Sequence, residues 1–288
     1  MIPVRVRRTL TTAGAVAMFL VLAGATYQGV ATALERRQFP HPGRLVDVGG
    51  HQLHIYCVGE GSPTVLLEAP ATGMSAAWGW VQPAVGALTR ACSYDRAGLG
   101  WSETGDTTFD PSTVAAQLHT LVERAGERGP FVLAGEGLGA AFVTLYAGQF
   151  GDDIAALVLI DSPSSPDAAP PGTDVSRIVN VSPWLARAGL LRATRLLSTN
   201  ARGLPQPSSG ALRSFLNRPD HLTRSARELA RWDAAVALAG AVPVNGRIRI
   251  IRVGTRGAER VAFLNGRGDA EAATARIVEA VNLVRRGR

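Results

Sequence analysis

The hydrophobic pattern divides the chain into an apolar N-terminal segment and a longer body of short alternating patterns. Residues 9–34 contain no charged side chain, and three arginines precede them. About 20 apolar residues suffice to cross a bilayer, and flanking positive charges favour the cytoplasmic side. The pattern therefore predicts a cytoplasmic N-terminus at 1–8, a transmembrane signal-anchor at 9–34 and a linker at 35–43. The body would lie outside the cytoplasm, held to the cell membrane by one span.

A cleaved signal peptide is the competing interpretation of this segment. Ala31, Thr32 and Ala33 form a small-x-small sequence of the kind that signal peptidases cut. The apolar stretch is long for a signal peptide, however, and Arg36 and Arg37 follow it as charges follow a membrane span. We therefore expect a retained anchor and keep cleavage as the alternative.

The body alternates strand-like and helix-like runs. Two alternating runs, 44–48 and 52–56, flank Gly49 and Gly50, which predicts a hairpin. Further strands are expected at 64–68, 91–95, 131–134, 156–161, 247–253 and 261–264, and helices at 81–90, 111–125, 140–150 and 269–286. Strands that alternate with helices predict a mostly parallel sheet covered by helices on both faces.

The pattern changes after Asp161. Residues 163–245 begin with a loop rich in Pro, Ser and Ala and continue as amphipathic helices, for example at 184–197 and 222–238. No clear strand pattern interrupts them. This predicts a helical cap inserted into an α/β core that is formed by residues 44–162 and 246–288.

Composition narrows the range of partners. Hydrophobic residues make up 46% of the 288, enough for a sizeable core, and the formal net charge is +7. All 30 basic residues are arginines, because the chain contains no lysine. We interpret the charge mainly as a solvated basic surface, with attraction to anionic lipid headgroups as the alternative. No basic cluster alternates with aromatic residues as in nucleic-acid-binding modules, so no nucleic-acid partner is expected.

The most informative local sequence is Phe-Val-Leu-Ala-Gly-Glu-Gly-Leu-Gly-Ala at 131–140. An apolar strand, a turn of small residues and a helix form the layout of a nucleophile elbow, which lifts a serine above a sheet. Gly135 and Gly139 suit the crowding of such a bend. At its centre, where a hydroxyl is expected, stands Gly137. Glycine has no side chain and cannot attack a substrate.

Several phrases together resemble the α/β-hydrolase superfamily, in particular its membrane-anchored bacterial members. They lie at 42–51, 53–57, 59–68, 92–102 and 157–161. The resemblance is strong over 42–162, weak over the cap, and recovers in about the last forty residues. It implies an α/β-hydrolase fold, with a mostly parallel sheet flanked by helices and a helical cap insertion.

The resemblance also implies a catalytic serine, acid and histidine, in that chain order. Here Gly137 stands in the place of the serine, and Arg267, in Asn-Gly-Arg ahead of the last helix, stands in the place of the histidine. None of the five histidines follows the cap, and arginine does not take up a proton at neutral pH. The acid is expected after strand 247–253, where only Glu259 is near, and a plain surface role for Glu259 is favoured.

The oxyanion hole implied by the family is altered as well. One donor is the backbone N–H of Leu138, which is retained. The other comes from a turn that here reads Pro70-Ala71-Thr72-Gly73, so that Ala71 is the candidate donor. Proline has no N–H to donate, and this turn therefore departs from the glycine-rich turn of relatives.

The strand order of the family places the two cysteines next to each other. Cys57 ends the strand-like run 54–57 and Cys92 lies in the run 91–94. The resemblance makes these the second and fourth strands, which are neighbours in α/β-hydrolases. An oxidising exterior allows a disulfide between them. We therefore expect the pair Cys57–Cys92.

A second interpretation of the elbow concerns nucleotides. Gly135, Gly137 and Ala140 fit the dinucleotide fingerprint G-x-G-x-x-G/A, and Asp161 closes the next strand, where a ribose-binding acid is expected. The motif lies in mid-chain among hydrolase-like phrases, and an exterior domain rarely meets NAD. Dinucleotide binding is therefore the weaker alternative, and we expect neither a cofactor nor a metal.

The functional expectation is a hydrolase-fold pseudoenzyme that acts by binding a ligand or a protein partner. A small acyl or lipid-like ligand under the cap follows from fold analogy, with Trp184, Leu185 and Leu190 as candidate lining residues, although a plain core role is the more common one. An active but atypical esterase- or lipase-like hydrolase is the alternative. It would need another nucleophile. Glu136 would need an acid that the sequence does not identify, and Ser162 is expected only to begin the cap loop.

Overall fold

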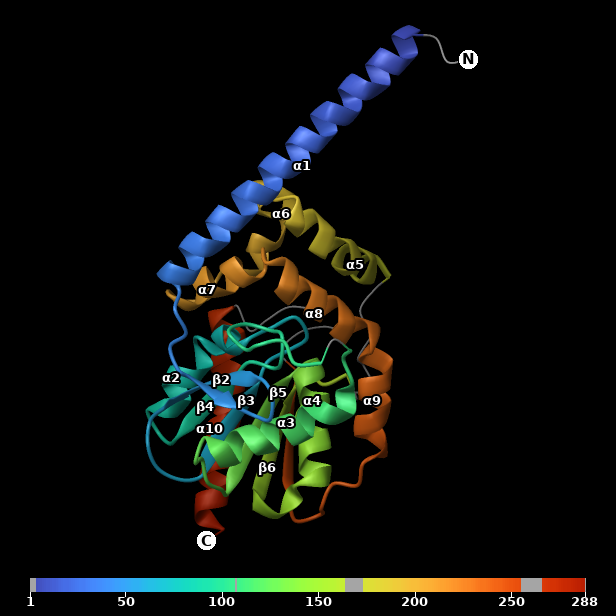
Figure 1. The fold of residues 1–288 in the computed structure, drawn as a ribbon. Helices are drawn as coiled ribbons and strands as arrows, with labels where there is room; N and C mark the ends of the chain where they lie inside the picture. The colour runs from blue at the N-terminus through green and yellow to red at the C-terminus, as the bar shows by residue number, and fades with distance from the viewer. Residues whose placement is uncertain (1–3, 107, 164–172, 255–265, 288) are drawn as a thin grey trace.

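The computed structural model describes residues 4–287 except 107, 164–172 and 255–265. The long helix α1 (Val4–Gln38) projects from a body of helices around a sheet (Figure 1). By length and composition α1 is able to cross a membrane. It continues to Gln38, so the stretch predicted as linker, 35–43, begins as helix.

The body contains a seven-stranded sheet in the order β1-β2-β4-β3-β5-β6-β7. The strands are β1 (Arg44–Asp47), β2 (Gln52–Val58), β3 (Thr64–Glu68), β4 (Ala91–Tyr94), β5 (Phe131–Glu136), β6 (Ile154–Ile160) and β7 (Arg249–Val253). β2 is antiparallel to β1 and β4, and the other neighbours are parallel. The predicted mostly parallel sheet is confirmed, while the strand expected at 261–264 lies outside the described residues.

The inner parallel strands β3, β5 and β6 are buried on both faces, whereas the edge strand β7 is partly exposed. Every residue of β3 is buried, and Leu66 pairs with Cys92 on one side and with Leu133 on the other. Continuous hydrophobic runs are typical of such strands, because helices cover both faces. The carboxyl ends of β3, β4 and β5 meet at one edge, where open α/β sheets bind ligands.

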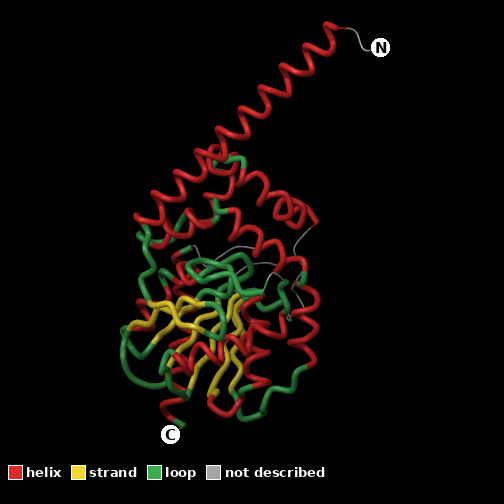
Figure 2. The backbone as a smooth tube through the Cα atoms, viewed as in Figure 1, coloured by secondary structure: helices red, strands yellow, loops and turns green. Residues whose placement is uncertain are grey.

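Helices cover the two faces of the sheet in separate groups (Figures 1 and 2). One face carries α3 (Pro111–Arg124), α4 (Leu138–Gln149) and α9 (Trp232–Ala241), and the other carries α2 (Val81–Gly86) and α10 (Arg267–Arg286). Short 3-10 turns, η1 (Ser75–Trp78) and η2 (Gly151–Asp153), complete the connections. Because α9 packs against α4 and α3, the end of the stretch predicted as cap, 163–245, joins the core layer.

The cap consists of the helices between β6 and α9. They are α5 (Thr173–Arg187), α6 (Leu190–Thr194), η3 (Leu196–Ala201), α7 (Ser208–Phe215) and α8 (Pro219–Ala230). The single helix predicted at 184–197 is wrong, because Gly189 adopts φ +73° and breaks it. The single helix predicted at 222–238 is wrong as well. It divides at Arg231, since α8 packs on the cap helix α5 whereas α9 packs on α4.

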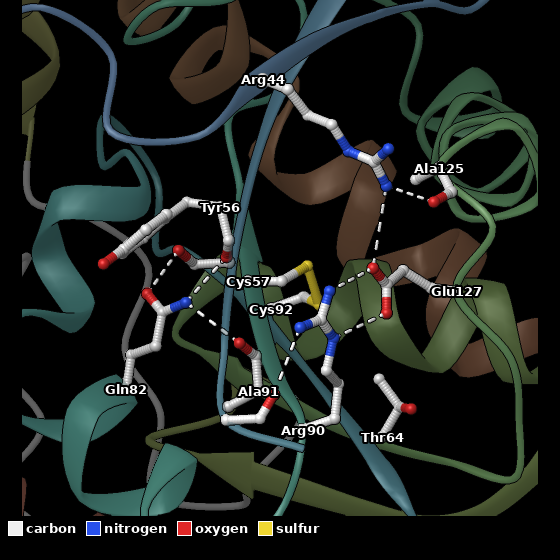
Figure 3. Close-up of a disulfide and its surroundings, with 12 residues drawn as sticks. Arg44, Tyr56, Cys57, Thr64, Gln82, Arg90, Ala91, Cys92, Ala125 and Glu127 are labelled. Atoms are coloured by element: carbon white, nitrogen blue, oxygen red, sulfur yellow. Dashed lines mark hydrogen bonds and ion pairs between the residues drawn. A yellow bond between two sulfur atoms is a disulfide. The ribbon is translucent and has the colours of Figure 1, made fainter. Parts of the chain in front are cut away.

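The predicted disulfide is confirmed. Cys57 and Cys92 stand directly opposite each other in β2 and β4, with a Cα–Cα distance of 4.0 Å (Figure 3). Closing a loop with a sequence separation of 35 stabilises the fold by about 3–4 kcal/mol in the loop-entropy model. Among the described residues, the one cluster with metal-ligand spacing joins these cysteines to Glu127, and both sulfurs are bonded to each other.

Candidate functional site

The turn between β5 and α4 has the geometry that the sequence predicts. Gly137 adopts φ +55° and ψ −123°, a conformation that residues with a side chain rarely take. Its N–H donates to the carbonyl of Ile160 over 2.9 Å, and its carbonyl accepts from Ala140, also over 2.9 Å. The backbone bend of an elbow is therefore present, with a bare Cα at its centre.

The three glycines of the elbow differ in what surrounds them. A Cβ on Gly135 would lie 2.4 Å from the carbonyl oxygen of Gly139, and one on Gly139 would lie 2.6 Å from that of Ala69. A Cβ on Gly137 would meet only Pro70 Cβ, at 3.7 Å, which is ordinary contact. Crowding thus requires glycine at 135 and 139 but leaves room for a side chain at 137.

The turn after β3 lies beside the elbow, as the contact between Pro70 and Gly137 shows. The N–H of Gly73 donates to the carbonyl of Pro70 over 3.0 Å and closes the turn, while Thr72 takes φ +63°. Ala71 and Leu138, the two candidate oxyanion donors, are both buried. The structure therefore brings the expected oxyanion elements close to the elbow.

Arg96, just after the carboxyl end of β4, forms hydrogen bonds with the backbone of this turn. Its guanidinium donates to the carbonyls of Ala69 over 2.7 Å and Pro70 over 2.9 Å, and to the carboxylate of Glu68. It also forms two hydrogen bonds of 2.9 Å to Glu228 on the cap helix α8. Burial lowers the pKa of Arg96, but Glu228 and Glu68 outweigh that effect and raise it. One buried cation thus joins sheet, turn and cap.

Glu68 ends β3 inside the same network. Tyr94 donates its hydroxyl to the Glu68 carboxylate, which also accepts from Arg96. Burial raises the pKa of Glu68 to about 7, although Arg96 and Tyr94 act in the opposite direction. The network therefore contains one carboxyl that exchanges a proton close to neutral pH.

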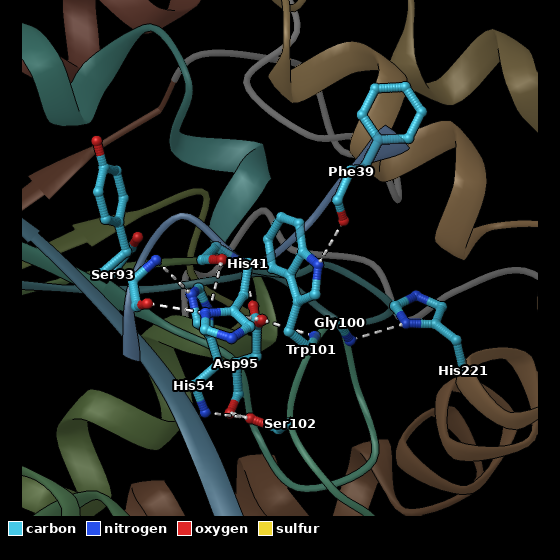
Figure 4. A network of polar contacts seen from close by, with 12 residues as sticks. Phe39, His41, His54, Ser93, Asp95, Gly100, Trp101, Ser102 and His221 are labelled. Atoms are coloured by element: carbon cyan, nitrogen blue, oxygen red, sulfur yellow. Dashed lines mark hydrogen bonds and ion pairs between the residues drawn. The ribbon is translucent and has the colours of Figure 1, made fainter. Parts of the chain in front are cut away.

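His221, also on α8, contacts the turn at a second point. Its Nδ1 accepts from the N–H of Gly100 over 3.1 Å (Figure 4), and its Nε2 lies 3.1 Å from the carbonyl of Thr72. A carbonyl only accepts, so Nε2 carries the proton. Burial lowers the pKa of His221. With both ring nitrogens engaged, this histidine has no lone pair left to act as a base.

A second histidine forms a cluster that resembles a catalytic triad by composition alone. His54 Nδ1 lies 2.9 Å from the carboxylate of Asp95 (Figure 4). It also lies 3.5 Å from Ser75 Oγ, and all three side chains are buried. The N–H of Gly43 donates to His54 Nε2 over 3.2 Å. In a working triad serine and acid use different ring nitrogens. Here both face Nδ1, so no nitrogen is free to take the proton of Ser75.

Asp95 organises the loop that follows β4. Besides His54, it accepts backbone N–H groups from Ser75 over 2.6 Å and Trp101 over 2.9 Å. Burial alone would raise the pKa of Asp95. His54 and the two backbone donors lower it by a larger amount, so the pKa lies below its ordinary value. The His54–Asp95 pair is a structural support for the elbow side of the sheet.

The remaining predicted residues do not supply the missing groups. Arg267 is the first residue of α10, where its exposed guanidinium pairs with Glu271 over 3.0 Å and lies 5.6 Å from the ring centre of Trp80. Glu259 lies outside the described residues. Glu136 is buried at the end of β5, and Ser162 is buried just after β6.

The cap side chains expected to line a pocket lie elsewhere. Trp184 is 71% exposed and Leu190 is 50% exposed, whereas Leu185 is half-buried. The expectation is wrong for Trp184 on α5 and for Leu190 on α6, because half or more of each side chain is exposed.

The sequence did not reveal the residues that join cap to core. Tyr94-Asp95-Arg96 contributed only to the fold resemblance, although a charged pair directly after a buried strand is the pattern of a buried polar network. Glu228 and His221 looked like ordinary residues of an amphipathic helix. Their role depends on where α8 docks.

Comparisons with known proteins agree with this geometry. The model of the alpha/beta hydrolase family matches residues 65–281. An uncharacterized protein of Schizosaccharomyces pombe is 31% identical over 116 residues, which are 39% of this chain and 21% of that protein. A putative non-heme chloroperoxidase of Synechocystis is 32% identical over 113 residues, which are 38% of this chain and 39% of that protein. The match thus spans well under half the length of these curated relatives.

A solved structure gives the same result for the fold. The enol-lactonase from Burkholderia xenovorans LB400 superposes with a TM-score of 0.62 at 16% identity, covering 83% of this chain and all of that one. At this identity the likeness concerns the fold alone.

Proposed function

Because the chain belongs to the alpha/beta hydrolase family, we propose that it is a membrane-anchored, extracytoplasmic member that has lost the serine–histidine machinery and acts by binding a ligand or a partner. The observation that carries the proposal is Gly137. It keeps the backbone conformation of an elbow, with space for a side chain, and offers no attacking atom.

The histidines support the proposal. His54 and His221 have both ring nitrogens engaged, as described above. His119 stacks on Phe150 with ring centres 3.9 Å apart, and His41 Nδ1 lies 2.8 Å from the carbonyl of Gly43. A proton acceptor poised beside the elbow is needed for hydrolysis by a serine mechanism. Arg267 does not provide one.

The contacts of α1 support a retained anchor over a cleaved signal peptide. Gln28 donates to the carbonyl of Asn217 over 2.6 Å and accepts from Arg192 over 2.9 Å. Cleavage after residue 33 would remove Gln28, and Arg192 would lose one of its hydrogen-bond acceptors. The arginines before residue 9 favour a cytoplasmic N-terminus, which would place the body outside.

The class of ligand follows from the location of the site. A molecule bound at the carboxyl ends of β3 and β5, beneath the cap, would face the N–H groups of Ala71 and Leu138. Such donors suit a carbonyl oxygen, which a small acyl or lipid-like compound supplies. The N–H of Gly137 is already donated to Ile160, which argues against a dinucleotide phosphate at this turn.

The test uses the full chain in detergent micelles. We expect no labelling by a fluorophosphonate and no turnover of p-nitrophenyl acetate or butyrate above a heat-inactivated sample. Labelling or turnover above that background would instead establish an active, atypical esterase- or lipase-like hydrolase. In the double variant Gly137→Ser and Arg267→His, gained fluorophosphonate labelling would place the lost nucleophile at 137.

A further inference from the structure

Five large apolar side chains stand exposed on the cap, and we call them the cap face. They are Ile178, Val181, Trp184, Leu190 and Leu196. The first three follow each other at every third position of α5, which places them along one side of the helix. Figure 1 shows α5 and α6 on the side of the body from which α1 projects.

The opposite side of α5 explains why the cap face is turned outward. Ser182 and Ala186 are buried there, where α5 packs against α8. The packing of the cap thus uses one side of α5 and leaves an apolar side on which Ile178, Val181 and Trp184 are 50%, 51% and 71% exposed. An exposed apolar surface of this kind marks an interaction site.

The cap packs against α1 at a defined position along that helix. The backbones approach closely at Gly24, where a Cβ would lie 2.1 Å from the carbonyl oxygen of Ala188. Gly189 fits the same contact, because a Cβ there would lie 2.7 Å from the carbonyl oxygen of Gly24. Gln28, one turn further along α1, is buried against the cap. The helix and the cap therefore meet from residue 24 onward.

The length of α1 brings the cap to the edge of the bilayer. Residues 9–23, the uncharged part ahead of the cap contact, form about 22 Å of helix at about 1.5 Å per residue. A hydrocarbon core of about 30 Å needs roughly 20 residues, and a tilted helix needs more. A span that starts after Arg8 therefore reaches to about residue 28, past the level at which Gly24 touches Ala188.

We propose that the cap face is a membrane-docking surface, which rests in the interface of the same bilayer that α1 crosses. The inference depends on the proposed insertion of α1. It follows because the bilayer edge lies level with the loop between α5 and α6, and the cap face extends from that loop. The occupant is the lipid of the outer leaflet.

The side chains at the cap face have the chemistry of interfacial residues. Trp184 is an aromatic residue of the kind enriched at membrane interfaces, as is Tyr27 on α1. The guanidinium of Arg187 lies 5.1 Å from the ring centre of Trp184, and Arg177 and Arg195 are exposed nearby in the sequence. A helix that combines an apolar side with arginines binds anionic lipid surfaces.

The test measures immersion depth in the full chain, reconstituted in phosphatidylcholine vesicles that contain phosphatidylglycerol. A nitroxide is attached to Val181→Cys on the cap face, to Met18→Cys in the middle of α1, or to Leu88→Cys. Leu88 is 49% exposed and precedes β4 at the sheet edge opposite the cap, so it is the aqueous control. Frequent collisions of the nitroxide with oxygen indicate that it lies in lipid. Frequent collisions with a water-soluble nickel chelate indicate that it lies in water.

We expect nickel accessibility at 181 to be several-fold lower than at 88, with the lowest value at 18. A label at 181 as accessible as that at 88, with 18 immersed, would overturn docking and leave the anchor intact. Nickel access at 18 as high as at 88 would overturn the anchor and the docking together. Dipolar broadening at 181 that persists at high lipid-to-protein ratio would assign the cap face to contact between copies, which also overturns docking.

Discussion

Arg96 and Glu228 form a two-pronged ion pair, with Nε–Oε1 and Nη2–Oε2 distances of 2.9 Å. Arg96 follows β4 in the core, and Glu228 lies on the cap helix α8, so the pair crosses the boundary between core and cap. Both side chains are buried. The remaining donors of Arg96 hold the carbonyls of the turn after β3. Cap position and turn geometry are thus coupled through one guanidinium.

Removing the carboxylate partner should destabilise the protein strongly. In Glu228→Gln the charge of Arg96 stays buried with only Glu68 to balance it, and breaking one side of a buried pair costs about 3–5 kcal/mol. Thermal unfolding in detergent measures the loss. Glu271→Gln, which breaks the exposed pair with Arg267, is the matched control, and its melting temperature should not change measurably. Equal melting temperatures for the two variants would show that Arg96 does not depend on Glu228.

The glycines of the elbow should differ in how far they tolerate substitution by a residue with a side chain. Gly139→Ala places a Cβ 2.6 Å from the carbonyl oxygens of Glu68 and Ala69, which cannot move without shifting β3, so we expect a loss of about 3 kcal/mol or more. A Cβ in Gly137→Ser makes only an ordinary contact with Pro70 Cβ at 3.7 Å, so the variant adds only backbone strain of about 1–3 kcal/mol. Melting temperatures of the two variants test this order. A lower melting temperature for Gly137→Ser than for Gly139→Ala would mean that the elbow has no room for a side chain at position 137.

Local patterns predicted the parts of the fold that local chemistry determines. Hydrophobic periodicity located β3, β5 and β6, and small residues located the elbow, because a sharp turn there excludes Cβ atoms at 135 and 139. The disulfide, by contrast, was expected from the strand order that the family resemblance implies, since Cys57 and Cys92 pair only when β2 and β4 are neighbours.

Features that depend on distant packing were not predictable. Whether a helix continues through Gly189 or Arg231 depends on which element each half packs against. Arg96 and Glu228 are 132 residues apart, and only the docking of α8 brings them together. The outward direction of Trp184 belongs to the same class, because an apolar side of a helix suits a protein core and a membrane surface equally well.

The disulfide should account for a measurable share of stability. The double variant Cys57→Ala and Cys92→Ala loses the loop closure between β2 and β4, which lowers the free energy of unfolding by about 3–4 kcal/mol. The melting temperature of the wild type should fall correspondingly on reduction, while that of the double variant should not respond to reductant. Titration of the unfolded, unreduced wild type should find no free thiol, and two thiols would contradict the bond.

Glu68 should give the stability an unusual dependence on pH. Its pKa is about 7 in the folded protein because of burial, above its ordinary value of 4.5. Between these values the folded protein keeps a proton that the unfolded chain has lost. Stability from this group is therefore fully present below about pH 4.5 and is lost as the pH rises to about 7. His221 acts in the opposite sense, because its pKa is lowered from 6.5, so its contribution is lost as the pH falls below that value.

Because these two groups oppose each other, the measurement compares Glu68→Gln with the wild type at each pH. Glutamine cannot ionise, so the variant lacks the Glu68 contribution while His221 remains. Between pH 4.5 and pH 7.5 the variant should gain about 3 kcal/mol of unfolding free energy relative to the wild type. Melting curves of both proteins in the same detergent across this range supply the values. A difference that stays constant with pH would mean that Glu68 remains ionised in the folded state, held by Arg96 as a permanent ion pair.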